Sequence, residues 1–387
     1  MRLRSLCLRN FRAHQETVVS FAPQVNLIVG PNGAGKTNLL EAIHYLCLGK
    51  SFLAPQDAYA LRQGAPFFEL EGQFCGTRRP ELTVRLVYVR EEGKRVFVNG
   101  APLERLADLV GLLPVVILSP ADQALTAGPP EERRRFVDNL LSQAYPAYLK
   151  DLLHYRRALQ QRNELLARLR RQPQAIPPAL LDSWQEELVL LGSRLIHRRL
   201  RWVQEFAQFL TEAHAYLGLT AEVPRIEYVT VASLDAEADL ADICCAFRDR
   251  LERLARRERE QGRTLAGPHR DELLLRLNGM EIRRYASQGQ HRMMGLALKL
   301  AQFLYLRARL EEMPLLLLDD VFDGLDPYRT HRILKLLQQE EVIGQSFLTA
   351  VRTELFKEAI DFATSVHRLI RVEQGRVVET TIAPSAL

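Results

Sequence analysis

Hydrophobic and polar residues follow a strand pattern at the two ends of the chain and a helical pattern between them. Up to about residue 128, apolar and polar positions mostly alternate around one helix. The stretch "RLVYVREEGKRVFVNG" alternates on both sides of a Glu-Glu-Gly turn and predicts a hairpin. From residue 129 to 261, leucine recurs at helical spacing among glutamate and arginine, which predicts helices. Strand patterns return after residue 262, for example in "MPLLLLDDVF".

This order predicts an α/β fold with two parts. Residues 1–128 and 262–387 form a head domain from both ends of the chain, and residues 129–261 form a helical, arginine-rich inserted lobe. As a single antiparallel hairpin, the lobe has arms of at most about 65 residues, or roughly 100 Å at 1.5 Å per residue. The prolines at positions 173, 177, 178 and 224 end or kink helices, so we expect a compact lobe.

The stretch "VNLIVGPNGAGKTNLLEAIHYL" predicts a phosphate-binding loop between a strand and a helix. Its glycines let successive backbone N–H groups face phosphate oxygens, and the helix N-terminus adds partial positive charge. Lys36 is expected to reach the β and γ phosphates of ATP, and Thr37 to offer a hydroxyl to Mg²⁺. The predicted nucleotide-binding residues here are Gly30, Pro31, Asn32, Gly33, Ala34, Gly35, Lys36, Thr37 and Asn38.

A second stretch, "PLLLLDDVFDGLD", predicts a buried strand that delivers two carboxylates to the same site. Asp319 is expected to hold Mg²⁺, and Asp320 to orient or deprotonate the attacking water. Gly324-Leu325-Asp326 follows as a turn that could reach a second subunit. A strand that only ends in solvated acids is the alternative, and the neighbouring phosphate loop argues against it.

The tetrapeptide Ser287-Gln288-Gly289-Gln290 opens a long apolar helix and carries no obvious chemistry. By itself it predicts a helix cap, with the Ser287 side chain accepting hydrogen bonds from free N–H groups. Whether this tetrapeptide has a function beyond capping the helix therefore depends on the other motifs of the chain.

Charge and composition narrow the function. The net charge is +5, and only seven of the 52 basic residues are lysines; arginines gather between residues 130 and 265. Arginine suits phosphate contact, but the interleaved glutamates are equally typical of a solvated helix, so DNA binding stays open on charge alone. The five cysteines lack C-x-x-C spacing, which argues against zinc and disulfides. Short apolar runs and the alternating N-terminus predict a cytoplasmic protein without a membrane anchor.

These motifs together resemble the ABC-type ATPases: a phosphate loop, a Ser-x-Gly-Gln tetrapeptide, a strand ending in two acids, and Gly-Leu-Asp. More narrowly, the chain resembles the RecF family of DNA replication and repair proteins over almost its whole length, in collinear order. The stretches that carry this resemblance are "LRNFRAH", "GPNGAGKTNLLEAIHYL", "PPEERRRFVDNLL", "GRTLAGPHRDEL", "ASQGQHR" and "LLLLDDVFDGLD".

The resemblance implies an ABC-type head that forms an ATP-dependent homodimer. Ser287 and Gly289 of one copy then contact the γ-phosphate held by the other, with Gln290 and Arg12 near the nucleotide. It also implies a weak, DNA-stimulated ATPase with Lys36, Asp320 and Ser287 as catalytic residues. Further implications are a clamp on DNA at gaps and single-strand junctions, RecR and RecO as partners, and loading of RecA.

Some positions depart from the expected pattern. Thr349 stands where transporter ATPases carry a switch histidine, which suggests slow hydrolysis, and Ala121 and Gln123 flank Asp122 where relatives have other residues. His269 and Arg270 either form a structural turn inside the head or take a direct part in the function. Two other classes share these motifs and are the alternatives: the ATPase subunit of an ABC transporter, and a chromosome-structuring ATPase of the SMC class with long coiled-coil arms.

Overall fold

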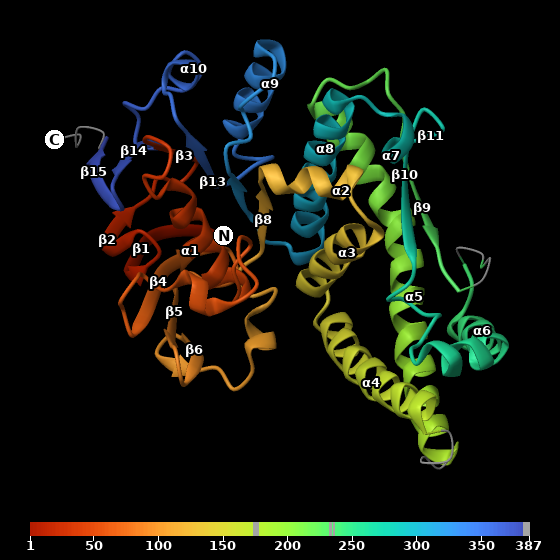
Figure 1. Cartoon of the computed structure of the whole chain (residues 1–387). Coiled ribbons are helices and arrows are strands. Elements are labelled where there is room, and N and C mark those ends of the chain that lie inside the picture. Colours follow the sequence, from red (N-terminus) through yellow and green to blue (C-terminus); the bar gives the residue numbers. More distant parts are fainter. Residues whose placement is uncertain (173–177, 232–233, 235–236, 382–387) are drawn as a thin grey trace. The chain divides into compact units, whose positions relative to one another are not determined.

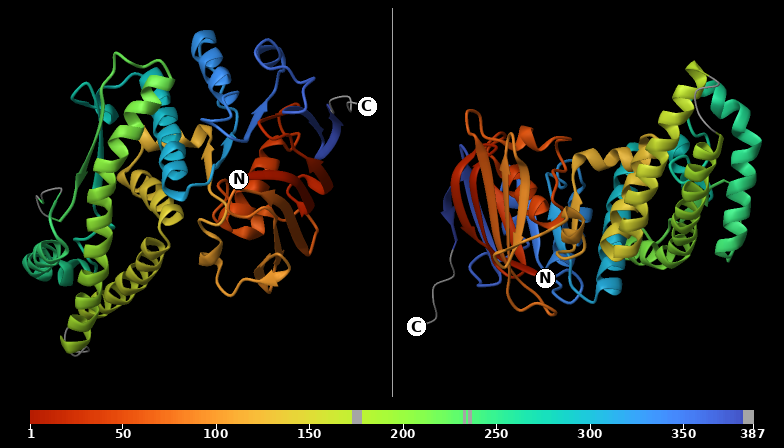
Figure 2. Two further views of the ribbon diagram at one scale, coloured as in Figure 1. Left: turned by 180° about the vertical axis from the view of Figure 1, so that it is seen from behind. Right: turned by 90° about the horizontal axis from the view of Figure 1, so that it is seen from below.

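The computed structural model describes residues 1–172, 178–231, 234 and 237–381. They group into two compact units. The first contains Met1–Asp122, Ala213–Thr220 and Leu296–Leu387, and the second contains Gln123–Glu212 and Ala221–Gly295. In the first unit, both ends of the chain lie side by side (red and blue in Figures 1 and 2), because β3 (Val25–Val29) pairs in parallel with β13 (Ser346–Ala350) and β14 (His367–Glu373).

One sheet of the first unit is mostly parallel, with strand order β15-β14-β3-β13-β12-β8. The other strands are β8 (Val115–Leu118), β12 (Leu315–Leu318) and β15 (Arg376–Thr380). All residues of β3 and β12 are buried, as expected for parallel strands that are covered on both faces. Because β13 lies between β3 and β12, the carboxyl ends of three neighbouring strands meet at one edge.

The other sheet of the first unit is antiparallel, with strand order β2-β1-β4-β5-β6-β7. Its strands are β1 (Arg2–Phe11), β2 (His14–Ser20), β4 (Phe67–Cys75), β5 (Leu82–Val89), β6 (Gly93–Val98) and β7 (Ala101–Pro102). The pairing of β5 with β6 confirms the predicted hairpin. Helix α1 (Lys36–Leu48) contacts strands of both sheets, and its apolar residues belong to the hydrophobic core that these strands form.

Short helices complete the first unit. They are the 3-10 helices Asp57–Ala60, Leu106–Leu109 and Pro120–Asp122, and the α-helices α9 (Pro327–Leu337) and α10 (Glu354–Lys357). The end of α5 and residues 296–310 of α8 also belong to this unit.

The second unit is mainly helical. Its helices are α2 (Gln123–Ala127), α3 (Pro130–Ala144), α4 (Pro146–Arg171), α5 (Pro178–Tyr216), α6 (Leu240–Gln261), α7 (Ile282–Tyr285) and the start of α8 (Gln288–Leu310). A small sheet has the order β11-β10-β9, formed by β9 (Pro224–Val229), β10 (Glu272–Leu277) and β11 (Met280–Glu281). Helices α4 and α5 meet through Leu165, Leu166 and Leu181 (Figure 1).

The units differ from the predicted domain boundaries. Residues 123–128 and 262–295 group with the helical segment, and residues 213–220 group with the first unit. One reason is β9, a strand inside the segment expected to be mostly helical, which pairs with β10. Its first residue is Pro224, a position where a strand tolerates proline. Pro173 and Pro177 lie outside the described residues.

The helices are too short for the long coiled-coil arms of the SMC class. Helix α5 has 39 residues, about 58 Å at 1.5 Å per residue, and α4 has 26 residues. In the part of the chain that the structure describes, no helix combines the length and the apolar character that a membrane span requires.

A buried ion pair ties α4 to α6 in the second unit. The Arg162 Nη2 atom donates to the Glu258 carboxylate at 2.7 Å, and both side chains are almost fully buried. The backbone N–H of Leu265 donates to the other oxygen of Glu258, also at 2.7 Å. The carboxylate therefore organises the chain that follows α6.

We predict that Glu258→Gln strongly destabilises the second unit, because it leaves the Arg162 charge buried without a counter-charge. The expected loss of unfolding free energy is about 3–5 kcal/mol. Both tryptophans, Trp184 and Trp202, lie on the second-unit part of α5. Tryptophan fluorescence during urea titration therefore reports the unfolding of this unit.

Glu260→Gln on the same helix is the matched control. Glu260 is exposed and pairs with exposed Arg256 at 2.9 Å. A surface pair of this kind contributes less than about 1 kcal/mol. Equal urea midpoints for the two variants would contradict a stabilising role for the buried pair.

Candidate nucleotide-binding site

The phosphate-binding loop joins β3 to α1. Gly33 and Gly35 have φ angles of 77° and 106°, which L side chains rarely adopt. At Gly30, an added Cβ would lie 2.1 Å from the carbonyl oxygen of Val372, so the neighbouring strand also requires glycine. Residues 31–33 are exposed, and an added Cβ at Gly33 would meet only open space. Such a loop presents N–H groups to a ligand at a helix N-terminus.

Lys36 is buried and spans its own loop. Its Nζ atom donates to the carbonyl oxygens of Gly30 at 2.9 Å and Pro31 at 3.1 Å. Thr37 and Asn38 are half-buried in the first turn of α1. The ammonium group is therefore held beside the loop, where it suits phosphate oxygens.

The predicted carboxylates lie at the same sheet edge. Asp319 follows β12, and the Thr37 Oγ1 atom donates to its carboxylate at 2.8 Å across 282 positions of sequence. Burial raises the pKa of Asp319, while hydrogen bonds from Thr349 and Thr37 oppose that shift. The Thr37 hydroxyl and the Asp319 carboxylate are oxygen ligands of the kind Mg²⁺ prefers. Among the described residues there is no group of three or more His, Cys, Asp or Glu that could hold a metal. Two protein ligands leave the other positions around an octahedral Mg²⁺ ion for phosphate oxygens and water.

Thr349, at the end of β13, connects the two acids. Its hydroxyl lies 2.8 Å from the Asp319 carboxylate and 3.2 Å from that of Asp320, and it accepts the Asp320 backbone N–H at 2.9 Å. Asp320 has a φ of 47°, a backbone conformation that costs energy and is often found at functional sites. The Thr349 side chain thus positions both carboxylates.

His14 is a residue of this site that the sequence did not single out. It is fully buried, and its Nε2 atom lies 3.1 Å from the Gly35 carbonyl oxygen, so Nε2 donates. Its Nδ1 atom then accepts from the Thr17 hydroxyl at 2.9 Å. Burial lowers the pKa of His14 below 6.5. The spacing of "NFRAH" ahead of a strand is the signal that could have pointed to it.

Arg12 is held against α1. Its Nε and Nη2 atoms donate to the two Glu41 oxygens at 2.9 and 2.7 Å, and its Nη1 atom donates to the Tyr59 carbonyl at 2.7 Å. Glu41 is fully buried. These bonds fix the guanidinium beside the helix that carries the phosphate loop.

The residues Ser287, Gly289 and Gln290 belong to the second unit. The backbone N–H of Gln290 donates to Ser287 Oγ at 3.3 Å, and the Ser287 N–H donates to the Gln290 side chain at 3.0 Å. This reciprocal pair is a capping box. Ser287 and Gly289 are both exposed. The first residues of α8 are thus exposed, and the partial positive charge of a helix N-terminus is compatible with an anion partner.

Two other predicted positions have local partners. The Asp122 carboxylate accepts the Ser119 N–H at 2.7 Å and pairs with Lys299 at 2.8 Å. Asp326 caps α9 by accepting the Arg329 N–H at 2.9 Å. Both contacts lie within the first unit.

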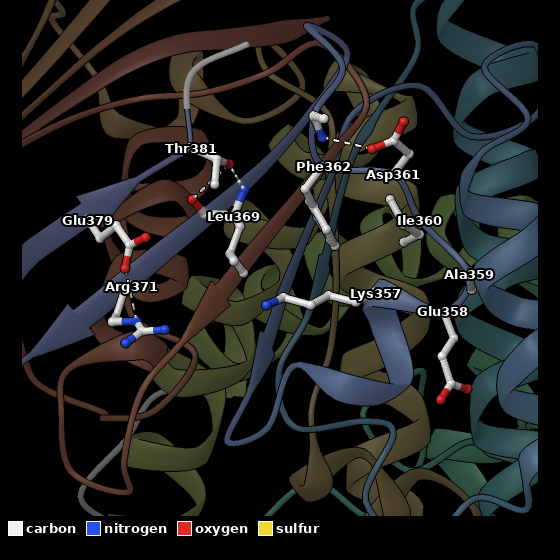
Figure 3. A pocket seen from close by; sticks show the side chains of 11 residues that line it. Lys357, Glu358, Ala359, Ile360, Asp361, Phe362, Leu369, Arg371, Glu379 and Thr381 are labelled. Carbon is white, nitrogen blue, oxygen red and sulfur yellow. Dashed lines mark hydrogen bonds and ion pairs between the residues drawn. The ribbon is translucent and has the colours of Figure 1, made fainter. Parts of the chain in front are cut away.

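A separate cavity of about 760 Å³ lies beside β14 and β15 (Figure 3). Residues 357–363 line it, together with Arg371 and Glu379, which pair at 3.3 Å. None of the phosphate-loop residues, Asp319 or Asp320 lines this cavity. It is therefore not the predicted nucleotide site.

Comparison with known proteins gives consistent matches. Residues 2–377 match the family described as the RecF/RecN/SMC N terminal domain. The DNA replication and repair protein RecF of Salinibacter ruber is 52% identical over 375 residues, which cover 97% of this chain and 91% of that protein. The chain belongs to the RecF family. A second member, from Chloroherpeton thalassium, is 44% identical and matches 92% of this chain and 97% of its own length.

Solved structures agree with RecF family membership. A structure described as the recombination mediator protein RecF-ATP in the RecFOR pathway has a TM-score of 0.89 and 28% identity, and the match covers 98% of this chain and 97% of the other. An Smc head bound to a domain of ScpA has a TM-score of 0.57 at 14% identity, which concerns the fold alone. The predicted fold class, an ABC-type α/β head with a helical inserted lobe, is confirmed. Membership in the RecF family also argues against a transporter ATPase subunit.

We predict that His14→Ala loosens the phosphate loop. Loss of a buried hydrogen bond should speed amide hydrogen exchange in residues 30–38 about tenfold. Because the pKa of His14 is lowered, the folded loop resists protonation. Wild-type protection should therefore be complete above pH 6.5 and decline as the pH falls toward the folded pKa. In the variant, protection should be low at every pH and lack this decline.

His331→Ala provides the control, because His331 is exposed on α9. It should leave exchange in residues 30–38 unchanged. If His14→Ala and His331→Ala gave the same protection in this peptide, His14 would not be a positioning residue of the loop.

Proposed function

We propose that this chain is an ATP-dependent DNA-binding protein of recombinational repair, in which ATP drives two copies to pair around DNA near gaps. The observation that carries the proposal is the cluster of Lys36, Thr37 and Asp319 at one sheet edge, with hydroxyl-to-carboxylate contact at 2.8 Å. Membership in the RecF family supplies the biological setting.

ATP would be held by the loop N–H groups and by Lys36, which suits the β and γ phosphates. A Mg²⁺ ion would neutralise phosphate charge while Thr37 and Asp319 hold it. The wider set of binding residues is Arg12, Gly30, Pro31, Asn32, Gly33, Ala34, Gly35, Asn38, Ser287, Gly289 and Gln290. The relatives solved as RecF-ATP support nucleotide binding.

Asp320 is the proposed general base for hydrolysis. Its carboxylate would accept a proton from the attacking water, and Thr349 would keep it in place through the 2.9 Å bond to the backbone N–H. Without a histidine at that position, hydrolysis is expected to be slow. Hydrolysis, stimulated by DNA, would open the paired copies and so release the clamp from DNA.

Pairing is proposed to place Ser287 and Gly289 of one copy on the γ-phosphate of the other. The exposure of Ser287 and Gly289 supports this, because a Cβ at Gly289 would meet no atom closer than the Ser287 Oγ at 3.9 Å. The partial positive charge at the N-terminus of α8 also favours an anion. ATP would then shift the monomer–dimer equilibrium, because only the dimer gains these contacts.

DNA is expected to be held through backbone phosphates, in keeping with the excess of arginine over lysine. Affinity should then fall steeply with salt. A relative described as a recombination mediator protein in the RecFOR pathway supports RecO and RecR as partners. RecA is the proposed protein that is loaded on single-stranded DNA, and the proposed location is the cytoplasm.

Light scattering tests the pairing. The hydrolysis-deficient Asp320→Asn variant should have a mass of 44.2 kDa without ATP and twice that mass with ATP. Adding Ser287→Arg should leave ATP binding to the monomer nearly intact and abolish the doubling, because the new side chain blocks the approach to the γ-phosphate.

Ser183→Arg in the same background is the control, since Ser183 is an exposed serine on α5. It should still pair with ATP. A monomer in ATP-bound Asp320→Asn, or a dimer that survives Ser287→Arg, would refute ATP-driven pairing through this tetrapeptide.

A further inference from the structure

Two family motifs meet in the second unit, apart from the nucleotide residues. The segment "ERRRF" lies at the start of α3, and "GPHRD" precedes β10. The Arg134 Nη1 atom donates to the Asp271 carbonyl at 2.9 Å, and Arg133 Nε donates to the Glu272 carboxylate at 2.9 Å. The sequence alone assigned no role to His269 and Arg270. The contacts between the two motifs suggest a role for the residues around them.

A buried polar network stiffens the region. Arg199 is 3% exposed; its Nη2 atom donates to Asp138 at 2.7 Å and its Nη1 atom donates to the Pro268 carbonyl at 2.8 Å. The Tyr148 hydroxyl also donates to Asp138, at 2.6 Å. Tyr155 and His269 form a further bond of 2.6 Å between the hydroxyl and Nδ1. These contacts fix the side chains without consuming every donor.

Above this network lies a cavity of about 260 Å³. Its polar lining includes four guanidinium groups and two carboxylates, those of Arg134, Arg135, Arg156, Arg199, Glu131 and Asp138. Burial lowers the pKa of His269, which also lines it, to about 4. The histidine is therefore neutral near pH 7, and the cavity carries an excess of positive charge.

The two carboxylates that line the cavity already form ion pairs with arginines. Glu131 pairs with Arg135 at 2.9 Å, and Asp138 pairs with Arg199 at 2.7 Å and with Arg156 at 3.3 Å. Arg134 is half-buried, and no carboxylate of the described residues lies within 4.0 Å of its guanidinium. Its hydrogen bond to a described residue, the Asp271 carbonyl, uses one of five N–H donors. Glu272, Glu131 and Asp271 act on Arg134 only from beyond ion-pair distance, and a half-buried cation without a direct ion pair favours an anionic ligand.

We propose that this cavity binds a phosphate group, with Arg134 as the central contact and Arg135 and Arg156 at its exposed rim. Guanidinium groups bind phosphate oxygens in bidentate fashion. The volume is below the roughly 300–1,000 Å³ of pockets for drug-sized ligands, which suits a small anion. The phosphate comes either from a DNA strand, in which case the inference rests on the proposed DNA binding, or from a free phosphate.

Fluorescence anisotropy with a labelled oligonucleotide tests the DNA source. Arg134→Gln and Arg156→Gln should each weaken binding about tenfold, and should reduce the slope of log K against log salt by about 1. Arg157→Gln is the control, because Arg157 is the exposed neighbour of Arg156 on α4 and does not line the cavity. It should leave the affinity and the slope unchanged.

A thermal-shift series tests the site without DNA. Inorganic phosphate, compared with chloride at equal ionic strength, should raise the melting temperature of wild type and Arg157→Gln more than that of Arg134→Gln and Arg156→Gln. Phosphate bound at the loop near Lys36 contributes equally to all four proteins. Arg156 is exposed, so its variant keeps the test decisive if Arg134→Gln fails to fold.

The two measurements separate the outcomes. Dependence on Arg134 and Arg156 in both series assigns a DNA phosphate, and dependence in the thermal series alone assigns a free phosphate. If Arg134→Gln and Arg156→Gln both match Arg157→Gln in the two series, the cavity is not a phosphate site. Wild type that binds no DNA would refute the proposed DNA binding, and the thermal series would still decide the cavity.

Discussion

The hydrogen bond from Thr37 to Asp319 is the contact on which the account of the site depends. It joins the two ends of the chain, because Thr37 follows β3 and Asp319 follows β12. Parallel pairing through β13 sets their separation, and Thr349 at the end of β13 bonds to Asp319 and Asp320. One sheet edge thus positions the Lys36 ammonium group, the hydroxyls of Thr37 and Thr349, and the carboxylates of Asp319 and Asp320.

Much of this site was predictable from sequence, because its motifs are local. The phosphate loop requires glycines in a fixed order between a strand and a helix, and the cap of α8 requires Ser287 and Gln290 three residues apart. The roles of His14 and Thr349 were not predictable. Each acts through a partner far away in sequence, the Gly35 carbonyl and the Asp319 carboxylate, and depends on strand order rather than on residue pattern.

The second unit shows the same limit on a larger scale. Helical spacing predicted its helices, but β9 was missed because its pairing with β10 spans a long stretch of chain. The pairing of β9 with β10 also contributes to the polar network around Arg199 and Asp271, because the Tyr228 hydroxyl of β9 donates to the Asp271 carboxylate. The buried Arg199 forms a direct ion pair with Asp138, whereas Arg134 donates to a backbone carbonyl and forms no ion pair with a described residue.

The central claim is that one active site is built from two copies of the chain. Light scattering on a mixture of Lys36→Ala and Ser287→Arg variants with ATP tests it most directly. Each variant alone should stay monomeric, since neither can complete a site. In a mixed pair, the loop of the Ser287→Arg copy meets the intact Ser287 of the Lys36→Ala copy, so the account predicts dimers only in the mixture. A mixture that stays monomeric while the wild-type chain pairs would contradict it.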